Sequence, residues 1–346
     1  MIKQNKVAIV GAGIAGLSCA TALEKCGFDV TIFEKSRGVS GRLSTRVTEH
    51  WQCDHGAQYF TARDPVFNAE VQRWVNAEVA QLWEPSLKVF DGNTFSAKEN
   101  ESNTMRYVGY PKNNAPAKWI AKSLNVLTET TVTNIHRHAE HWQVSSKEHG
   151  LHAENFDFII LSIPAPQAEV LLHDTNPRLA SLCASVEMQP AFALMVHFGQ
   201  TVPCQFDGLF INRGLLSWIA RDSAKPGRMQ ELTTNSETWV LHASSVWSKA
   251  HVNDEKEFVS QQMLAEFIRI LHSDEYFNAT APVAITPASF DLHRWLYADC
   301  AHYLADVYQL DTEQKIGLCG DWLNGGKIQG AWLSGLKLAQ ALINNS

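Results

Sequence analysis

Short apolar runs and segments with helical spacing alternate near both ends of the chain. Residues 6–10 (KVAIV) form an apolar, β-branched run, and residues 14–25 place apolar side chains at helical intervals after a glycine turn. A second apolar run at 29–33 (DVTIF) completes a predicted strand–helix–strand unit. Near the other end, IGLCGDW predicts a strand that precedes a helix from Gly330 to Leu342.

The middle of the chain has a different pattern. FDFIILSIP is continuously apolar at its centre and predicts a strand buried on both faces. Alternating strands are predicted in FALMVHF, LLSWIA and TWVLHA, with helices near 66–79, 115–124 and 255–272. We therefore expect an α/β fold with two domains. The first, with a mainly parallel sheet, is assigned residues 1–64, 125–164 and 292–346; the second, an α+β domain with a mixed or antiparallel sheet, is assigned residues 65–124 and 165–291.

Composition and charge exclude several classes of protein. With 346 residues, 45% hydrophobic and 19% charged, the chain is typical of a globular protein large enough for a substantial core. A formal charge of −7 disfavours nucleic acid as a partner. The seven cysteines are isolated, which predicts reduced thiols and no metal site. No stretch is typical of a signal peptide or a membrane span, so we expect a cytoplasmic protein without a membrane partner, of undetermined oligomeric state.

A glycine motif lies between the first predicted strand and helix. Gly11, Gly13 and Gly16 form GxGxxG, in which the first glycine permits the turn, the second lets a pyrophosphate approach and the third allows close helix packing. Glu34 follows 18 residues after Gly16, where a carboxylate can accept both ribose hydroxyls. It would repel a 2′-phosphate, so FAD or NAD(H) fits and NADP(H) does not. The alternative is a structural glycine turn with a surface glutamate.

A second candidate strand and helix, around Gly320 and Asp321, favours the longer of these ligands. An NAD-binding domain completes its site within its N-terminal region, whereas FAD extends past the pyrophosphate to a ribityl chain and a flavin. Asp321 could accept hydrogen bonds from the ribityl hydroxyls. The helix after Gly330 could direct its positive end at the flavin N1/O2 edge. We therefore expect FAD, bound by both ends of the chain.

The motifs GAGIAGL, SRGVSGRLSTR, DHGAQYFTAR, HRWLYA and GDW…GAWLSG, in this order, resemble the renalase family, in particular its bacterial members. The resemblance spans the chain and implies an amine-oxidase-like flavoprotein with non-covalent FAD on a two-dinucleotide-binding, GR2-like domain beside a substrate domain. It also implies that the stretch containing Gln58 and Tyr59 runs beside the flavin. The expected cofactor-binding residues are Gly11, Gly13, Ile14, Ala15, Gly16, Glu34, Lys35, Gly41, Arg42, Gln58, Tyr59, Val132, Gly320, Asp321, Gly330 and Ala331.

One position departs from the pattern of the wider group. Where paired glycines often precede the arginine, this chain has Ser40 and Gly41 before Arg42. The change costs little provided that Ser40 keeps φ below zero.

The resemblance implies oxidation of off-pathway dihydro isomers of NAD(P)H, with a hydride passing to the flavin and the electrons then reducing O2 to hydrogen peroxide. A dihydropyridine becomes aromatic when it loses hydride, so positioning can dominate over acid and base groups. The candidate catalytic residues are His242 and Tyr59, and the candidates for contact with the dinucleotide-like substrate are Arg221, Arg228, His242 and Trp295.

Each candidate also has a structural interpretation. His242, Tyr59 and Trp295 could be core residues, and Arg221 and Arg228 could be solvated at the surface. Two other functions stay open. An amine or amino-acid oxidase, or a related desaturase, would share the fold, and a flavin-carrying sensor would bind FAD without turnover.

Overall fold

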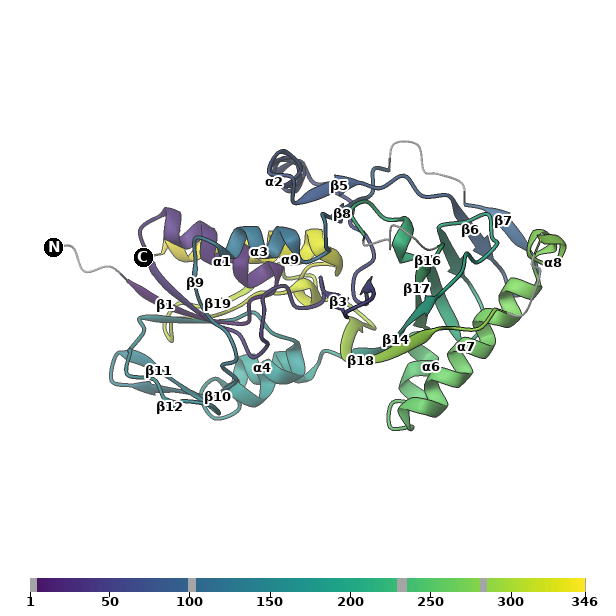
Figure 1. Ribbon diagram of the computed structural model, residues 1–346. Helices are drawn as coiled ribbons and strands as arrows, with labels where there is room; N and C mark the ends of the chain where they lie inside the picture. Colours follow the sequence, from purple (N-terminus) through teal and green to yellow (C-terminus); the bar gives the residue numbers. More distant parts are fainter. Residues whose placement is uncertain (1–4, 99–103, 229–234, 281–284, 346) are drawn as a thin grey trace.

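The computed structural model describes residues 5–98, 104–228, 235–280 and 285–345. Two β-sheets lie at opposite ends of the molecule, and the small hairpin strand β3 lies between them (Figure 1). Chain segments cross from one sheet to the other several times, so neither sheet is a continuous stretch of sequence.

The first sheet has β1 at its centre and is parallel except for one edge strand. β1 pairs in parallel with β2 on one side and with β13 on the other, and only β19 runs antiparallel to its neighbour. This confirms the predicted mainly parallel sheet with strands from both ends of the chain. In spatial order its strands are β19 (Gln309–Asp311), β20 (Ile316–Leu318), β13 (Phe158–Leu161), β1 (Lys6–Val10), β2 (Asp29–Phe33) and β9 (Asn125–Leu127).

Both faces of this sheet are covered, which explains its continuously apolar strands. Val7 and Ile9 of β1 face one hydrophobic cluster, and Ala8 and Val10 face another. Helices α1, α3 and α9 lie on the first side, and a three-stranded sheet with α4 lies on the second (Figure 1). The bounds are α1 Ile14–Lys25, α3 Ala115–Ala121, α9 Lys327–Asn344, α4 Ala165–Leu172, α5 Pro177–Ala184, β10 Val132–His138, β11 His141–Ser146 and β12 Gly150–Leu151.

Helices α1 and α9 pack against each other at a small residue. A Cβ on Gly335 would collide with the carbonyl oxygen of Ala15 and would lie 3.1 Å from the backbone nitrogen of Cys19. The Ser18 hydroxyl donates to the carbonyl of Trp332 at 2.9 Å. The two ends of the chain therefore meet along one helix pair.

The prediction that the last helix begins at Gly330 is wrong, because α9 begins at Lys327. Gly325, Gly326 and Lys327 all have positive φ, so the chain turns sharply just before the helix. Gly330 lies in the first turns of α9, where a Cβ would collide with the carbonyl oxygen of Asn324. A glycine is therefore needed at position 330 for this close approach, and it does not mark the start of the helix.

The second sheet has seven strands and is antiparallel except for the β15–β6 pair. It confirms the predicted mixed sheet. One face packs on α7, through a cluster that contains Phe192, Leu194 and Phe267, and the opposite face carries Met195 and Trp218 in a separate cluster. In spatial order the strands are β18 (Ser289–Cys300), β14 (Met188–Phe198), β17 (Glu237–Ala243), β16 (Leu216–Arg221), β15 (Gly208–Ile211), β6 (Leu87–Phe90) and β7 (Phe95–Ala97).

The remaining elements connect or cover these sheets. The helix predicted at 66–79 spans Pro65–Asn76, where Asp64 caps its start by accepting from the amides of Val66 and Phe67. No helix in the described ranges is long and apolar enough to cross a bilayer. The other bounds are α2 Pro65–Asn76, α6 Ser245–Ala250, α7 Lys256–His272, α8 Glu275–Thr280, β3 Thr45–Val47, β4 Gln52–Asp54, β5 Ala80–Leu82, β8 Tyr107–Gly109, η1 Asp222–Ala224 and η2 Asp321–Leu323.

The division of the chain into two domains stays a prediction. Residues of α2 and α3 share a hydrophobic cluster with β1 and α1, and residues of α4 and α5 share one with β13. Strand β18 begins at Ser289, three residues before the predicted boundary at 292.

Candidate active site

The glycine motif forms a tight turn from β1 into α1. Gly11 has a φ of 105°, and a Cβ there would collide with the carbonyl oxygen of Ser162. A Cβ on Gly16 would collide with the carbonyl oxygen of Gly11, so this glycine allows the helix to approach the strand. A Cβ on Gly13 would meet nothing within 4 Å, so space is open beside this residue, at the start of α1. Ile14 and Ala15 contribute the first helical amides, which have no acceptor inside the helix. This arrangement suits a pyrophosphate.

Glu34 lies directly after β2 and is buried. One carboxylate oxygen accepts from the Ala12 amide at 2.8 Å, and the other accepts from the Ser36 amide at 2.8 Å. Each oxygen keeps further acceptor capacity for a ribose hydroxyl. Val132, which begins β10, follows closely after Thr130, whose amide donates to the carbonyl of Glu34 at 2.9 Å. The next residue after Glu34, Lys35, is exposed.

Ser40 does not have the negative φ at which a serine in place of glycine would cost little. Its φ is 123°, in the region that favours glycine, although its side chain is buried. Its amide donates to the carbonyl of Ala12 at 3.0 Å, and this contact holds the loop against the glycine turn. Gly41 also has positive φ, at 56°, and a Cβ there would lie 3.6 Å from the Cα of Gly13. The loop before Arg42 therefore forms a second wall beside the turn, at a cost in backbone strain.

Arg42 and Asp321 come from opposite ends of the sequence and form an ion pair of 2.5 Å. Arg42 also donates to the carbonyl of Ala298 at 3.0 Å. Burial opposes the guanidinium charge, but Asp321 outweighs burial and raises the pKa of Arg42. Gly320 precedes Asp321 and donates its amide to the Ser334 hydroxyl at 2.9 Å, which connects this loop to α9. In α9, Ala331 follows Gly330 and is partly buried.

These residues fit FAD. They provide open space at Gly13, helical amides for a pyrophosphate, a buried carboxylate for a ribose and a carboxylate at Asp321 for a ribityl chain. The buried hydroxyl of Ser162, beside the glycine turn, has no hydrogen-bond partner among the described residues. Such an atom is expected where a polar ligand completes the site.

Residues 54–59 (DHGAQY) are expected beside the flavin from the family resemblance, and we call them the flavin-side segment. They lie against the Arg42 loop. A Cβ on Gly56 would collide with the carbonyl oxygen of Arg42, to which the Ala57 amide donates at 2.9 Å. Gln58 is buried and donates to the carbonyls of Asp54 and Gly56, at 2.7 and 3.2 Å. The segment is therefore fixed tightly beside Arg42, one of the expected cofactor residues.

Tyr59 belongs to an aromatic group that joins this segment to the second sheet. Its ring lies 5.9 Å from that of Trp83 and 6.0 Å from that of Trp218. The guanidinium of Arg106 lies 5.6 Å from its ring centroid. Tyr59 thus packs as an aromatic residue at the junction of the flavin-side segment and the sheet.

A row of side chains crosses the second sheet on the face that the flavin-side segment covers. Ala193 pairs with both His293 and His242, His242 pairs with Trp218, and Trp218 pairs with Phe210. Directly paired residues of antiparallel strands share a face, so these five side chains are neighbours. We call this set the imidazole row.

His55 of the flavin-side segment packs on one end of the imidazole row. Its ring lies 4.8 Å from that of His293 and stacks on Trp295 at 5.4 Å with an interplanar angle of 16°. The indole nitrogen of Trp295 donates to the carbonyl of His55 at 2.8 Å. Among the described residues, neither Nδ1 of His55 nor Nε2 of His242 has a hydrogen-bond partner, although both atoms are buried.

The histidines of this face are held neutral. Burial, with a smaller effect from Lys225, lowers the pKa of His242 to about 4. Burial, with the neighbouring His293 and Arg46, lowers the pKa of His55 to about 3. Burial and Arg46 also lower the pKa of His293. At neutral pH this face therefore presents aromatic rings and uncharged imidazoles.

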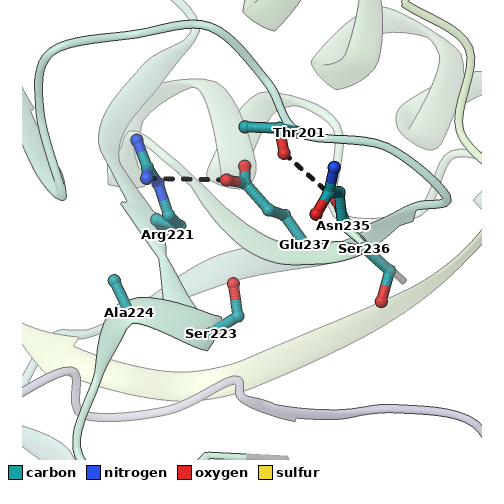
Figure 2. Close-up of a pocket in the computed structure, with 7 residues that line it drawn as sticks. All are labelled: Thr201, Arg221, Ser223, Ala224, Asn235, Ser236 and Glu237. Carbon is teal, nitrogen blue, oxygen red and sulfur yellow. Dashed lines mark hydrogen bonds and ion pairs between the residues drawn. The ribbon is translucent and has the colours of Figure 1, made fainter. Parts of the chain in front are cut away.

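Arg221 and Arg228 lie apart from the imidazole row. Arg221 lines a cavity of about 230 Å³ with Thr201, Ser223, Ala224, Asn235, Ser236 and Glu237, and Figure 2 shows its guanidinium directed at Glu237, 3.5 Å away. Arg228 is fully buried and forms a 2.5 Å ion pair with Asp54. It also lies 3.8 Å from the Asp222 carboxylate and donates to backbone carbonyls, including that of Gly109 at 2.9 Å. The substrate contacts proposed for both arginines stay predictions. In the structure both guanidinium groups pair with carboxylates of the protein.

Several residues of this region were not singled out from the sequence. Asp54 and His55 lie in the motif DHGAQYFTAR, Asp222 and Lys225 in ARDSAKPGR, and His293 in HRWLYA. The motifs contained these residues, but only the folded chain shows which side chains meet. Among the described residues, no group of three or more histidine, cysteine, aspartate or glutamate side chains is placed to hold a metal ion.

The fold and the cofactor end of this site define an FAD-binding oxidoreductase with a Rossmann-like nucleotide domain. The chain matches the description NAD(P)-binding Rossmann-like domain over residues 9–76 and Flavin containing amine oxidoreductase over residues 94–343. It therefore belongs to the flavin-containing amine oxidoreductase family.

Curated relatives match shorter stretches. The chain is 24% identical over 129 residues to 4,4'-diaponeurosporene oxygenase of Staphylococcus haemolyticus, a match that covers 32% of this chain and 26% of the relative. It is 36% identical over 93 residues to L-amino-acid oxidase of Siganus canaliculatus, covering 26% of this chain and 16% of the relative. The chain thus aligns with about a quarter or less of the length of these relatives.

Solved structures match over the whole chain. Cyclohexylamine oxidase from Brevibacterium oxydans IH-35A superposes with a TM-score of 0.71 at 11% identity, covering 99% of each chain. Wild-type putrescine oxidase bound to putrescine gives a TM-score of 0.67 at 14% identity, again covering 99% of each chain. At these identities the agreement concerns the fold.

Proposed function

We propose that this protein is a renalase-like, FAD-dependent oxidase that converts off-pathway dihydro isomers of NAD(P)H to NAD(P)+ and hydrogen peroxide. The resemblance of its motifs supports this proposal, as does family membership, which supplies the flavin chemistry. The observation that carries it is the neutral imidazole row beside the flavin-side segment.

That face suits a flat, uncharged ring. Trp218 and Tyr59 provide aromatic surface, and Nε2 of His242 is a buried polar atom that lacks a protein partner among the described residues. A dihydropyridine is a flat neutral ring whose carboxamide can hydrogen-bond to a neutral imidazole. His242 would then fix the rotation of the nicotinamide, and the aromatic rings would fix its plane.

The reaction requires little acid or base chemistry from the protein. FAD, when bound, supplies the two-electron acceptor that takes the hydride and passes the electrons to O2. The C–H bond of the dihydropyridine breaks with its electron pair, and solvent supplies the proton that completes hydrogen peroxide. The side chains of this chain therefore bind and orient the substrate and exclude water, which agrees with neutral histidines at the site.

Oxidation of an amine is the second candidate, because the aromatic group of Tyr59, Trp83 and Trp218 also suits a neutral amine. It differs in one requirement. An ammonium substrate must lose a proton before hydride transfer, and the histidines near this face have pKa values lowered to about 3 and about 4, which makes them weak bases.

The test is anaerobic stopped-flow mixing of the holoenzyme with 1,2-dihydro-NAD, with a primary amine and with an L-amino acid in parallel. Bleaching of the oxidised flavin band within seconds by the dihydronicotinamide alone supports the proposal. Bleaching by the amine or amino acid alone would overturn it in favour of the second candidate. Failure of all three substrates would leave a flavin-binding protein without this turnover and would also contradict the proposal.

The same experiment tests His242. We expect His242→Ala to weaken binding of the dihydronicotinamide about tenfold, because a hydrogen bond made in a buried site is lost. The matched control is His173→Ala, since the His173 side chain is 78% exposed and pairs with its sequence neighbour Asp174. Unchanged binding and flavin reduction in His242→Ala would exclude the role proposed for this residue.

A further inference from the structure

Four charged side chains form a buried group that joins Asp54 of the flavin-side segment to the chain that follows β16. Asp54, Asp222, Lys225 and Arg228 are all fully buried, with two positive and two negative charges. Asp54 comes from the end of β4, whereas Asp222, Lys225 and Arg228 lie in and directly after η1, which follows β16 of the second sheet. We call these residues the buried charge cluster. Of its members, only Arg228 was a candidate for substrate contact, and its pairing inside the cluster leaves Asp54, Asp222 and Lys225 without an assigned role.

Lys225 is the centre of the buried charge cluster. Its ammonium donates to Asp222 at 2.7 Å, to Asp54 at 3.1 Å and to the side-chain oxygen of Gln58 at 3.0 Å. An ammonium has three N–H groups, so these acceptors use all of its donors. The bond to Gln58 is therefore part of a complete coordination and not an incidental contact.

The cluster fixes the flavin-side segment at both ends. Asp54 accepts from Thr45 at 2.7 Å with one oxygen, and from Lys225 and Arg228 with the other. Gln58 is held by Lys225 through its oxygen and by the carbonyl of Asp54 through its nitrogen. Between these two residues, His55 contacts the Trp295 indole and Gly56 contacts the Arg42 carbonyl, so both are also held in place.

Removing four charges from water costs free energy that their pairing only partly recovers. The buried charge cluster is therefore weak evidence of a stabilising role. Burial raises the pKa of Asp222 to about 6, and the negative charge of Asp54 adds to this increase. Burial opposes the charge of Asp54 as well, but Lys225 and Arg228 prevail and lower its pKa. Hydrophobic side chains of the same shape would avoid the cost of burying charge. They could not, however, hold the side-chain amide of Gln58 in one orientation by hydrogen bonds.

We propose that Lys225 is a positioning residue, which orients Gln58 and thereby sets the flavin-side segment against the bound FAD. The inference rests on the proposed place of this segment beside the flavin, but not on the identity of the substrate. It also gives the second sheet a direct mechanical connection to the cofactor, since η1 continues from the strand that carries Trp218 of the imidazole row.

The test compares variants of the full-length holoprotein by visible circular dichroism of the oxidised flavin and by FAD dissociation constant. Lys225→Met combined with Asp222→Asn removes the donor to Gln58 while leaving Asp54 and Arg228 as a balanced pair. We expect about tenfold weaker FAD binding and an altered dichroism band, because a charge-assisted hydrogen bond is lost. Asp222→Asn alone keeps the Lys225–Gln58 bond and should retain both signals. Lys249→Met, at an exposed ion pair with Glu187, is the matched lysine control.

Gln58→Met provides an independent arm that keeps all four charges. It should reproduce the change in dichroism and affinity, and the triple variant should bind FAD no more than about twofold worse than the double variant, because both changes break one interaction. An unchanged flavin signal in Gln58→Met would overturn the proposal even if the double variant failed to fold. Multiplicative loss in the triple variant would also overturn it, since Lys225 would then act separately from Gln58. None of these readouts requires a substrate, so they stand apart from the test of the proposed function.

Discussion

The two ends of the candidate active site are built in different ways. At the cofactor end the walls are largely backbone: the turn at Gly11, the open Cα of Gly13 and the first amides of two helices. At the proposed substrate end they are side chains of separate strands, such as His242 of β17 and Trp218 of β16. Backbone geometry can serve one cofactor throughout a family, whereas side chains can change without disturbing the fold.

The two ends also differ in electrostatics. The cofactor end carries partly accessible charge, with the Arg42 side chain 31% exposed in its pair with Asp321. The substrate end keeps its histidines neutral and encloses charge completely in the buried charge cluster. We therefore expect substitutions at the cofactor end to act on folding and FAD affinity, and those at the substrate end to act on pH dependence and turnover.

The largest effect is expected where the chain ends meet. Gly335→Ala places a Cβ against the carbonyl of Ala15 on the facing helix, where backbone and not a flexible side chain must move. We expect a loss of about 3 kcal/mol in the free energy of unfolding, measured by urea denaturation. The control is Gly199→Ala, where a Cβ would meet nothing within 4 Å. Equal stability of the two variants would show that α1 and α9 can separate without cost.

The next effect concerns FAD affinity. Glu34→Ala removes a buried carboxylate that accepts from the amides of Ala12 and Ser36 and is proposed to bind the ribose. We expect the FAD dissociation constant, measured by titration of the apoprotein, to rise about 30-fold, the equivalent of about 2 kcal/mol. Glu49→Ala, at an 88% exposed side chain, should leave it unchanged. If both variants bound FAD equally well, the backbone alone would account for cofactor binding.

A smaller effect of opposite sign is expected at the strained loop. Ser40→Gly relieves a φ of 123° and should raise the free energy of unfolding by about 1 kcal/mol, which thermal denaturation can measure. Ser36→Gly is the control, because Ser36 is not among the residues with positive φ, and glycine there should reduce stability slightly. Loss of stability in Ser40→Gly would mean that the serine hydroxyl contributes more than the strain costs.

The last effect appears only at acidic pH and concerns stability at the proposed substrate end. The pKa of His242 is lowered from 6.5 to about 4 in the folded protein, so the unfolded chain binds its proton more readily. Its contribution to stability is present above pH 6.5 and is lost as the pH falls through about 4. In His242→Asn, the melting temperature should fall by about 4 °C less between these pH values than in the parent, since a shift of this size is equivalent to about 3 kcal/mol. Parallel pH curves for the two proteins would contradict the neutral assignment of this imidazole.

Local sequence patterns predicted the cofactor end well. Strands 6–10 and 29–33 and helix 14–25 were predicted at the bounds that the structure has, since a strand, a glycine turn and a helix are specified by adjacent residues. The start of α9 was misplaced by three residues because Gly330 looked like a helix boundary. Its actual role, a close approach to Asn324, depends on a loop whose path the pattern does not give.

The sequence by itself determined the fold class, the nucleotide turn and the FAD cofactor, because these depend on spacing along the chain and on the backbone freedom of particular glycines. Only the tertiary structure decided that Arg42 pairs with Asp321, that Ser40 is strained, and that Lys225 holds Gln58. These contacts join residues up to 279 positions apart, and a side chain's charge, orientation and pKa depend on neighbours that only folding brings together.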